Sequence, residues 1–525
     1  MLVTTVMAVA APAHSRWQWM KQSDGTPIEV MLVGDERMHY FVDREGNTFS
    51  VDSLGRLSPL LTQDFQRMER RAQARRKAFS TPLQSHTFLG ERRQLVILAA
   101  FSNASFVSPS PVDLWGKIFN QEKFSEGRFH GSVHDYFADQ SYGKFLLSFD
   151  LMFAQLTKPY GYYGGNDPNG NDEKVGEFVV DAIKEIEKDV TDWSPYDWDG
   201  DGTVEQVFIL FAGKGQNDGG SSQAIWPQQW RLSEEGTGSY TVSSGGKDFI
   251  IDNFGCFAEL DGDGGYGSFG TLCHEYGHCL GLPDFYYGTS SSVVHAWDVM
   301  DYGLYNDDGY CPAGYSAHER MFLGWLDIKE LTAPVTIKQM APVNEQQEAY
   351  LIRNDAYEDE FFVLENRQKT GWDTHLPGSG LMIFHIDYNE DVWLYGVPNS
   401  YALKRYSVVP ANNKSNRYYE GGWAYPCSSP DNHSFTDNSS PAATLIHTAG
   451  GKYLGKPVTN IQLSDGLASF DFMGGNPSGI ALSPSQEERP QRIYDLMGSY
   501  RGTSLVPLPA GIYLINGQKV VKGER

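Results

Sequence analysis

The segment CHEYGHCLGLPDFY, Cys273 to Tyr286, constrains the local fold more tightly than any other part of the chain. His274 and His278 are four residues apart, so on a helix they share one face and both imidazoles can reach one metal ion. Gly281 and Pro283 predict that this helix ends at once, because glycine accepts a left-handed C-cap and proline cannot continue a helix. The chain therefore turns back directly after the two histidines.

This turn brings Asp284 within reach of the same ion. Its carboxylate completes a set of three protein ligands and leaves the fourth zinc position open for water, as catalysis requires. Glu275 follows the first ligand without being one, so we predict that it is the general base that takes a proton from the metal-activated water. An amphipathic helix with two surface histidines would share the spacing, but it would not need the helix stop or the aspartate.

A second segment, HAWDVMDYG, follows at His295 to Gly303. An HExxHxxGxx(H/D) motif followed by such a methionine turn is the metzincin arrangement. In that arrangement Met300 forms an apolar floor beneath the metal, and Tyr302 points its hydroxyl at the ion or at the oxyanion of the tetrahedral intermediate. The alternative is that Met300 only fills the core and Tyr302 only packs.

In these and other segments the chain resembles the immune inhibitor A family of bacterial zinc metallopeptidases. The similar segments are IEVMLVGDERMHYFVDREGNTFS (28–50), LVILAAF (95–101), GSVHDYFADQSYGKF (131–145), YDWDGDGTVEQVFILFAGKG (196–215), HEYGHCLGLPDFY (274–286), WDVMDYG (297–303), AGYSAHERMFLGWL (313–326) and FFVLENRQKTGWDTHLPGSGLMIFHID (361–387). The resemblance covers most of residues 25–474. It implies zinc held by His274, His278 and Asp284, Glu275 as base, proteolysis of protein or peptide substrates, synthesis as a precursor, and frequent calcium binding.

An acidic loop predicts a second kind of cation. Asp197, Asp199 and Asp201 alternate and are followed by Gly202 and Glu205, as in the first half of an EF-hand loop. Carboxylates this close repel one another unless a cation joins them. The four acidic residues are therefore candidate calcium ligands, although position 12 of the loop is not glutamate and a solvated acidic turn is the alternative.

Changes in composition along the chain predict an α+β protein. We expect a small β-rich N-terminal prodomain, a metzincin-like zinc peptidase domain and a β-sandwich domain. The predicted parts are a signal-peptide-like segment (1–13), a prodomain with a basic linker (14–88), the zinc metallopeptidase domain (89–328), the β-sandwich domain (329–474), and a linker with a C-terminal tail (475–525). The tail resembles sorting signals of type IX bacterial secretion.

The first residues and the overall charge predict where such a protein works. The apolar run Leu2 to Ala13 ends in Ala-Pro-Ala, as a secretory signal does, so we expect a secreted or cell-surface protein exported through the bacterial envelope. No later stretch is apolar for the ~20 residues that a membrane span needs. The formal net charge of −24 argues against nucleic acid as a partner. The oligomeric state and the pairing of the five cysteines stay open.

The N-terminal unit is predicted to keep the enzyme latent until the Arg-rich link, Arg67 to Lys77, is cut. No cysteine precedes Cys256, so a thiolate of this unit cannot block the zinc. We expect instead a carboxylate such as Asp35 or Glu36, or coverage of the cleft beside a strand at Phe249 to Ile251. The alternative function is a catalytically inactive, peptidase-like binding or adhesion protein that acts through its β-domain.

Overall fold

The computed structural model describes residues 11–475 except 37, 53, 76–87, 167–171, 288–292, 395, 397 and 401, and also residues 493–495, 500–502, 511–515 and 518–522. Residues 1–10 of the predicted signal segment and residues 76 and 77 of the predicted activation link lie outside these residues. The chain divides into two compact units, Met1–Pro477 and Ser478–Arg525. Within the described part, no helix combines the length and apolarity needed to cross a bilayer.

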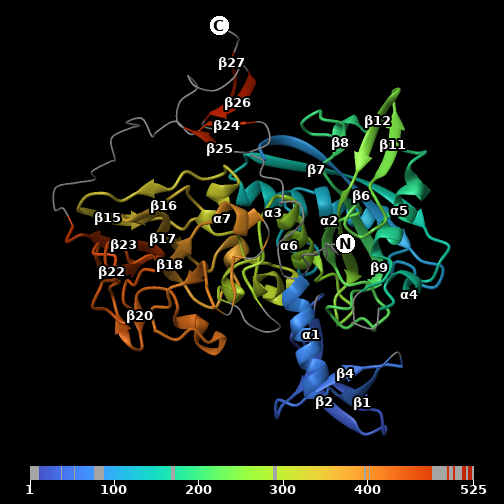
Figure 1. Ribbon diagram of the computed structural model, residues 1–525, viewed down its shortest axis with the longest axis horizontal. Coiled ribbons are helices and arrows are strands. Elements are labelled where there is room, and N and C mark those ends of the chain that lie inside the picture. The colour runs from blue at the N-terminus through green and yellow to red at the C-terminus, as the bar shows by residue number, and fades with distance from the viewer. Residues whose placement is uncertain are drawn as a thin grey trace. The chain divides into compact units, whose positions relative to one another are not determined.

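Five short strands near the N-terminus close into a barrel, to which a helix is attached (Figure 1). These elements are β1 (Trp17–Gln22), β2 (Pro27–Asp35), β3 (Met38–Asp43), β4 (Thr48–Val51), β5 (Arg56–Pro59) and α1 (Thr62–Arg75). Alternating apolar residues point inward, as a half-buried strand requires. The small core contains Val30, Leu32 and Phe41, and it also contains Trp226 from a distant part of the chain.

The site is built on a five-stranded sheet of order β10-β13-β9-β6-β7. Its strands are β6 (Gly90–Ala100), β7 (Phe145–Gln155), β9 (Val207–Lys214), β10 (Gln228–Arg231) and β13 (Asn253–Leu260). All neighbours are parallel except β10, which runs antiparallel to β13 at one edge. The predicted strand at residues 95–101 is found as part of β6, which ends at Ala100 and lies between β9 and β7 inside the sheet.

Both faces of this sheet are buried, because the side chains of a strand alternate between its two faces. On β6, Val96 and Leu98 face one core, while Leu95 and Ile97 face the other. Helices cover both faces: α2 (Pro111–Asn120), α3 (Val133–Gln140) and α6 (Phe269–Cys279) share the first core, and α5 (Val175–Ile186) lies in the second. A four-residue helix, α4 (Tyr160–Tyr163), precedes α5.

The strand predicted at Phe249 to Ile251 exists, but it does not line the cleft. It belongs to β12 (Lys247–Ile251), which pairs with β11 (Tyr240–Ser244) and β8 (Thr203–Val204) in a separate three-stranded sheet. The edge strand that α6 contacts is β10. The apolar run at Phe249 to Ile251 did not reveal this sheet membership, because strand pairing is a long-range property.

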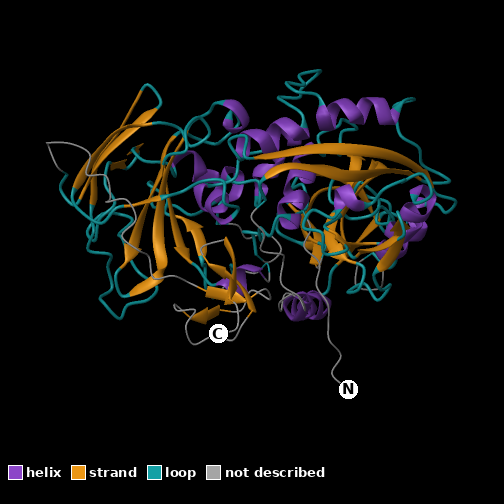
Figure 2. Ribbon diagram, turned by 90° about the horizontal axis from the view of Figure 1, so that it is seen from above, coloured by secondary structure: helices purple, strands orange, loops and turns teal. Residues whose placement is uncertain are grey.

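Residues 329–472 contain mainly strands and loops, whereas helices gather around the five-stranded sheet (Figure 2). One sheet has the order β14-β16-β17-β18-β19 and another the order β15-β23-β22. A common core joins them, with Ile352, Phe362 and Ile383 from the first and Val335 and Phe470 from the second. The strands are β14 (Lys329–Glu330), β15 (Val335–Met340), β16 (Ala349–Asn354), β17 (Tyr357–Arg367), β18 (Gly380–Asp387), β19 (Tyr406–Val408), β22 (Val458–Ser464) and β23 (Leu467–Phe472).

Short elements complete this part: α7 (Ala317–Phe322), α8 (Glu390–Leu394) and the two-stranded sheet of β20 (Cys427–Ser428) and β21 (Asp431–Asn432). The 3-10 helices are η1 (Ser194–Tyr196), η2 (His295–Trp297), η3 (Tyr302–Gly309), η4 (Gly371–Asp373) and η5 (Arg417–Gly422), and η3 is kinked at residues 306–308, where the backbone is not helical. The second unit holds a four-stranded sheet of β24 (Ile493–Asp495), β25 (Tyr500–Gly502), β26 (Gly511–Ile515) and β27 (Gln518–Lys522).

Candidate metal centre and active site

The two histidines lie on α6, which is buried along its whole length. The helix ends where the sequence predicts. Gly281 adopts a left-handed φ of 90°, and the amide of Leu282 donates to the carbonyl of Gly277 at 3.0 Å. This cap reverses the chain and carries Asp284 back over the end of the helix.

The three predicted ligands meet at one point. His274 Nε2 lies 3.2 Å from His278 Nε2, and both nitrogens lie 3.3 Å from Asp284 Oδ1. Tetrahedral zinc with bonds of 2.0–2.1 Å would place its nitrogen and oxygen ligands about 3.3–3.4 Å apart. The donor set and its spacing therefore fit a zinc ion that keeps a fourth position open.

Backbone carbonyls orient both imidazoles. His274 Nδ1 lies 2.8 Å from the carbonyl oxygen of Val299, and His278 Nδ1 lies 2.7 Å from that of Leu282. A proton on each Nδ1 leaves Nε2 as the metal-binding atom. Burial lowers the pKa of His278, which keeps that imidazole neutral. Burial alone would raise the pKa of Asp284, but the neighbouring His278 and His274 hold it well below its usual range.

Glu275 is fully buried beside this triad. Burial raises its pKa well above the ordinary value, and the charges of Asp284 and Glu36 raise it further. The backbone amide of Ala11 donates to Glu275 Oε1 at 2.7 Å, and this hydrogen bond lowers the pKa of Glu275. The predicted base is thus covered by the N-terminal segment, in surroundings that favour its protonated form.

Met300 lies under the metal-binding helix. It is fully buried, and its carbonyl accepts the amide of Phe285, the residue after the predicted third ligand, at 3.0 Å. A β-carbon added at Gly277 would lie 2.5 Å from Met300 Sδ. The glycine inside the HEYGH segment is therefore what lets the methionine turn approach the helix, a requirement that the sequence interpretation missed.

Tyr302 is placed less directly than predicted. Its ring stacks on His295 with centroids 5.0 Å apart and meets Tyr286 edge-on at 6.5 Å. Tyr286 in turn stacks on the ligand His274 at 6.4 Å. Burial raises the pKa of Tyr302 above its ordinary value, so its hydroxyl stays protonated.

A second tyrosine, which the sequence did not single out, lies in the same cleft. The Tyr305 hydroxyl donates to the carbonyl of Pro12 and accepts from Asn217 Nδ2 at 3.1 Å. Because Pro12 follows the residue that contacts Glu275, Tyr305 binds the backbone that occupies the site. Only its position three residues after Tyr302 could have suggested it.

The N-terminal segment occupies the cleft through backbone contacts. Trp226 Nε1 donates to the Ala11 carbonyl at 2.9 Å, and the His14 amide donates to the Asn217 carbonyl at 2.9 Å. The His14 ring stacks on Tyr305 with centroids 4.0 Å apart. The barrel is attached here too, since His39 stacks on Trp226 at 4.6 Å.

The acidic loop brings together three of its four candidate ligands. Asp197, Asp199 and Glu205 can each place a carboxylate oxygen within 4.8 Å of the others. Asp201 instead accepts the amide of Thr203 at 2.7 Å. Burial, followed by the charges of Asp199 and Asp197, raises the pKa of Glu205 to about 8. This electrostatic strain is what a bound cation would relieve.

Residues 113–325 match the family model described as immune inhibitor A peptidase M6, catalytic domain. This part of the chain is therefore similar to the catalytic domain of the peptidase M6 family. The M6 match contains the HEYGH helix, Asp284, the methionine turn and the acidic loop. The candidate metal-binding residues His274, His278 and Asp284 thus lie inside the stretch that matches a metallopeptidase family.

Similar proteins carry names of the same kind. The chain is 29% identical over 223 residues to the pre-pro-metalloprotease PrtV of Vibrio cholerae. The match covers 37% of this chain and 23% of that protein. It is 25% identical over 310 residues to immune inhibitor A of Bacillus thuringiensis. That match covers 49% of this chain and 44% of that protein. The match thus spans less than half the length of either relative.

Proposed function

We propose that the chain is a zinc-dependent endopeptidase, exported as a latent precursor. The observation that carries this proposal is the meeting of His274 Nε2, His278 Nε2 and Asp284 Oδ1 at 3.2–3.3 Å beside a buried glutamate. Bound zinc would supply Lewis-acid polarisation of the substrate carbonyl and of water. The roles below belong to residues of the chain itself.

Glu275 acts as general base and then as general acid. It takes a proton from the attacking water and returns it to the nitrogen of the leaving amine as the peptide C–N bond breaks. A tyrosine hydroxyl, of Tyr302 or Tyr305, donates to the oxyanion that develops on the carbonyl. An extended peptide pairs along β10, the antiparallel edge strand that α6 contacts, so substrates are unfolded or loop segments of proteins.

The proposal includes the finer architecture. The five-stranded sheet with its antiparallel edge, helix α6 and the Met300 turn support a metzincin-like catalytic domain. The two sheets that share a core in residues 329–472 support a β-sandwich. The closed barrel of β1–β5 supports a prodomain, and PrtV is likewise named as a pre-pro form.

Latency follows from the contacts of the N-terminal segment. Ala11 donates to the base, Tyr305 is engaged by Pro12, and Glu36 raises the pKa of Glu275. With that segment in place, the base is buried and a substrate cannot enter. A cut in the Arg-rich link, Arg67 to Lys77, most of which lies in α1, would release the barrel and open the cleft. Ala11 and Pro12 fall within the predicted export signal, so after its removal latency would depend on contacts that lie beyond it. These are the contacts of His14 with Asn217 and Tyr305, the charge of Glu36 near Glu275, and the stacking of His39 on Trp226.

A casein-digestion assay tests the activity. The activated protein should degrade casein, lose this activity to a chelator and regain it with zinc. The matched variant Glu275→Gln keeps the size of the side chain but removes the base, and it should be inactive while retaining zinc. If activated protein with full zinc occupancy leaves casein intact, the alternative holds, namely a peptidase-like binding or adhesion protein that acts through its β-domain.

A further inference from the structure

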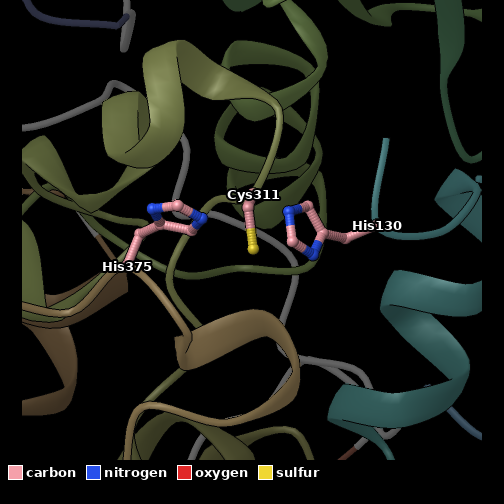
Figure 3. Close-up of side chains that lie close together, drawn as sticks. All are labelled: His130, Cys311 and His375. Atoms are coloured by element: carbon pink, nitrogen blue, oxygen red, sulfur yellow. The ribbon is translucent and has the colours of Figure 1, made fainter. Parts of the chain in front are cut away.

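A second group of metal-binding side chains lies outside the triad on α6. His130 precedes α3, Cys311 follows η3, and His375 follows η4 in the β-rich part of the chain. Each offers a ligand atom, and these atoms lie within 4.8 Å of one another. Figure 3 shows the two imidazoles on opposite sides of the Cys311 sulfur, from three separate segments.

Asp307 supplies a fourth donor. Its Oδ2 lies 3.9 Å from His130 Nε2 and 3.9 Å from His375 Nε2. Its other oxygen, Oδ1, accepts a hydrogen bond from Arg128 at 2.7 Å, which fixes the carboxylate in the orientation that presents Oδ2 to the histidines. The backbone at Asp307 has a positive φ of 51°, a conformation in which non-glycine residues are uncommon.

The burial of these donors suits a site that closes around an ion. Cys311 is fully buried, with its sulfur 3.4 Å from the carbonyl oxygen of Trp372. The side chains of His130 and His375 are 36% and 37% exposed, so both rings can turn. Tetrahedral zinc bound by sulfur at 2.3 Å and nitrogen at 2.0–2.1 Å would place its ligands about 3.3–3.6 Å apart. Small rotations of the two exposed rings would bring the donors toward that spacing, while Arg128 keeps Asp307 Oδ2 facing the histidines.

We propose that His130, Cys311, His375 and Asp307 form a second zinc site, which ties the M6 domain to the β-rich domain that follows it. Three of the donors come from within residues 113–325 and the fourth, His375, from beyond them. Four protein ligands leave no open position, so the site is structural. As the zinc–sulfur bond forms, the Cys311 thiol loses its proton to solvent, and no electron is transferred.

The site would also hold the segment that lines the cleft. Asp307 and the tyrosines Tyr302 and Tyr305 all belong to η3, and Cys311 follows two residues after its end. Zinc at one end of η3 would restrict the motion of the segment that carries both cleft tyrosines. This consequence rests on the proposed peptidase function, whereas the metal site itself does not.

Cobalt substitution in the full chain distinguishes this site from the one on α6. Cobalt bound to a thiolate shows a sulfur-to-metal charge-transfer band in the near ultraviolet, and the set His274, His278 and Asp284 contains no sulfur. The wild-type chain should therefore show this band at one equivalent of cobalt beyond the α6 site. Cys311→Ser should abolish it, while Cys427→Ser, which replaces a buried thiol elsewhere, should keep it.

The exposed histidines test the site without disturbing the core. His130→Ala and His375→Ala should each weaken binding in a competing-chelator titration by more than the 10–100-fold that loss of an outer-shell partner costs. His433→Ala, which removes an exposed histidine of the β-rich part, should leave the affinity unchanged. Two results would overturn the proposal. One is that the wild-type chain shows no sulfur-to-cobalt charge-transfer band although cobalt fills the α6 site. The other is that this band persists in Cys311→Ser.

Discussion

Glu275 is the residue on which the proposed chemistry depends most. It follows a ligand, is fully buried and has no place in the set of three ligand atoms. We predict that Glu275→Ala, once activated, binds zinc as the wild type does but hydrolyses casein about 10²–10⁴-fold more slowly, the usual worth of a general base. Rates with zinc content measured in parallel decide this. A variant within about threefold of wild type would show that another group is the base.

Asp284 depends on its position after the helix cap. Its carboxylate lies 3.3 Å from both ligand nitrogens, so Asp284→Ala removes one of three metal contacts. We expect zinc to be lost to a competing chelator at far lower chelator concentration than in the wild type. His318→Ala is a control, because His318 is buried outside the cluster and packs against Trp393. Equal zinc retention in Asp284→Ala and wild type would remove Asp284 from the ligand set.

Tyr302 and Tyr305 are both candidates for the hydroxyl that donates to the oxyanion. Tyr305 hydrogen-bonds the backbone of Pro12, whereas Tyr302 hydrogen-bonds Ser15 and packs against Tyr286, which stacks on His274. The tyrosine that binds the oxyanion should, when changed to phenylalanine, lower kcat and kcat/KM together by about 10²–10³. The other change should mainly alter KM. If neither variant lowers kcat, no tyrosine hydroxyl assists the reaction.

Among the structural elements, the acidic loop should couple stability to calcium and pH. The pKa of Glu205 is raised to about 8, above its unfolded value near 4.5. Its uncharged form therefore stabilises the ion-free fold below about pH 4.5, and this contribution is lost as pH rises toward and through 8. Calcium reverses the trend by pairing with the charged form, so the gain in Tm on adding millimolar calcium should be larger at pH 8 than at pH 5.

Matched variants check the calcium prediction. Glu205→Gln should flatten the pH dependence of Tm in calcium-free protein and reduce the gain from calcium. Asp201→Asn should have the smaller effect, because Asp201 lies outside the three-carboxylate cluster. The same calcium response in wild type and Glu205→Gln would contradict the site.

At the scale of the whole molecule, the barrel and the segment before it should inhibit the proposed peptidase domain. Their contacts cover the base and engage Trp226 and Tyr305. A chain that begins at Phe88 keeps the hydrogen bond between the Phe88 carbonyl and Trp325, so it retains that anchor of the catalytic part. It should cleave a short peptide much faster than the full-length chain. Equal specific activities would limit the N-terminal unit to folding or export.

The sequence by itself determined the features that a few consecutive residues encode. The spacing of His274 and His278 follows from helical periodicity, and the cap at Gly281 carries Asp284 back, so three ligands meet within eleven residues. Strand β6 was predictable for the same reason, since a run of apolar residues long enough for one strand must be buried on both faces. The absence of cysteine before Cys256 leaves Asp35 and Glu36 as predicted blocking carboxylates, and the charge of Glu36 contributes to the raised pKa of Glu275.

Tertiary structure decided whatever depends on pairing between distant segments. The edge strand beside α6 is β10, and the run at Phe249 to Ile251 belongs to another sheet. This arrangement follows from long-range strand order. His375 lies close to His130 and Cys311, although it is 245 and 64 residues away from them in the sequence. No local sequence motif could therefore predict this cluster. Helical periodicity and helix caps depend on residues within one or two helical turns. Contacts between distant segments form only when the separate cores pack together.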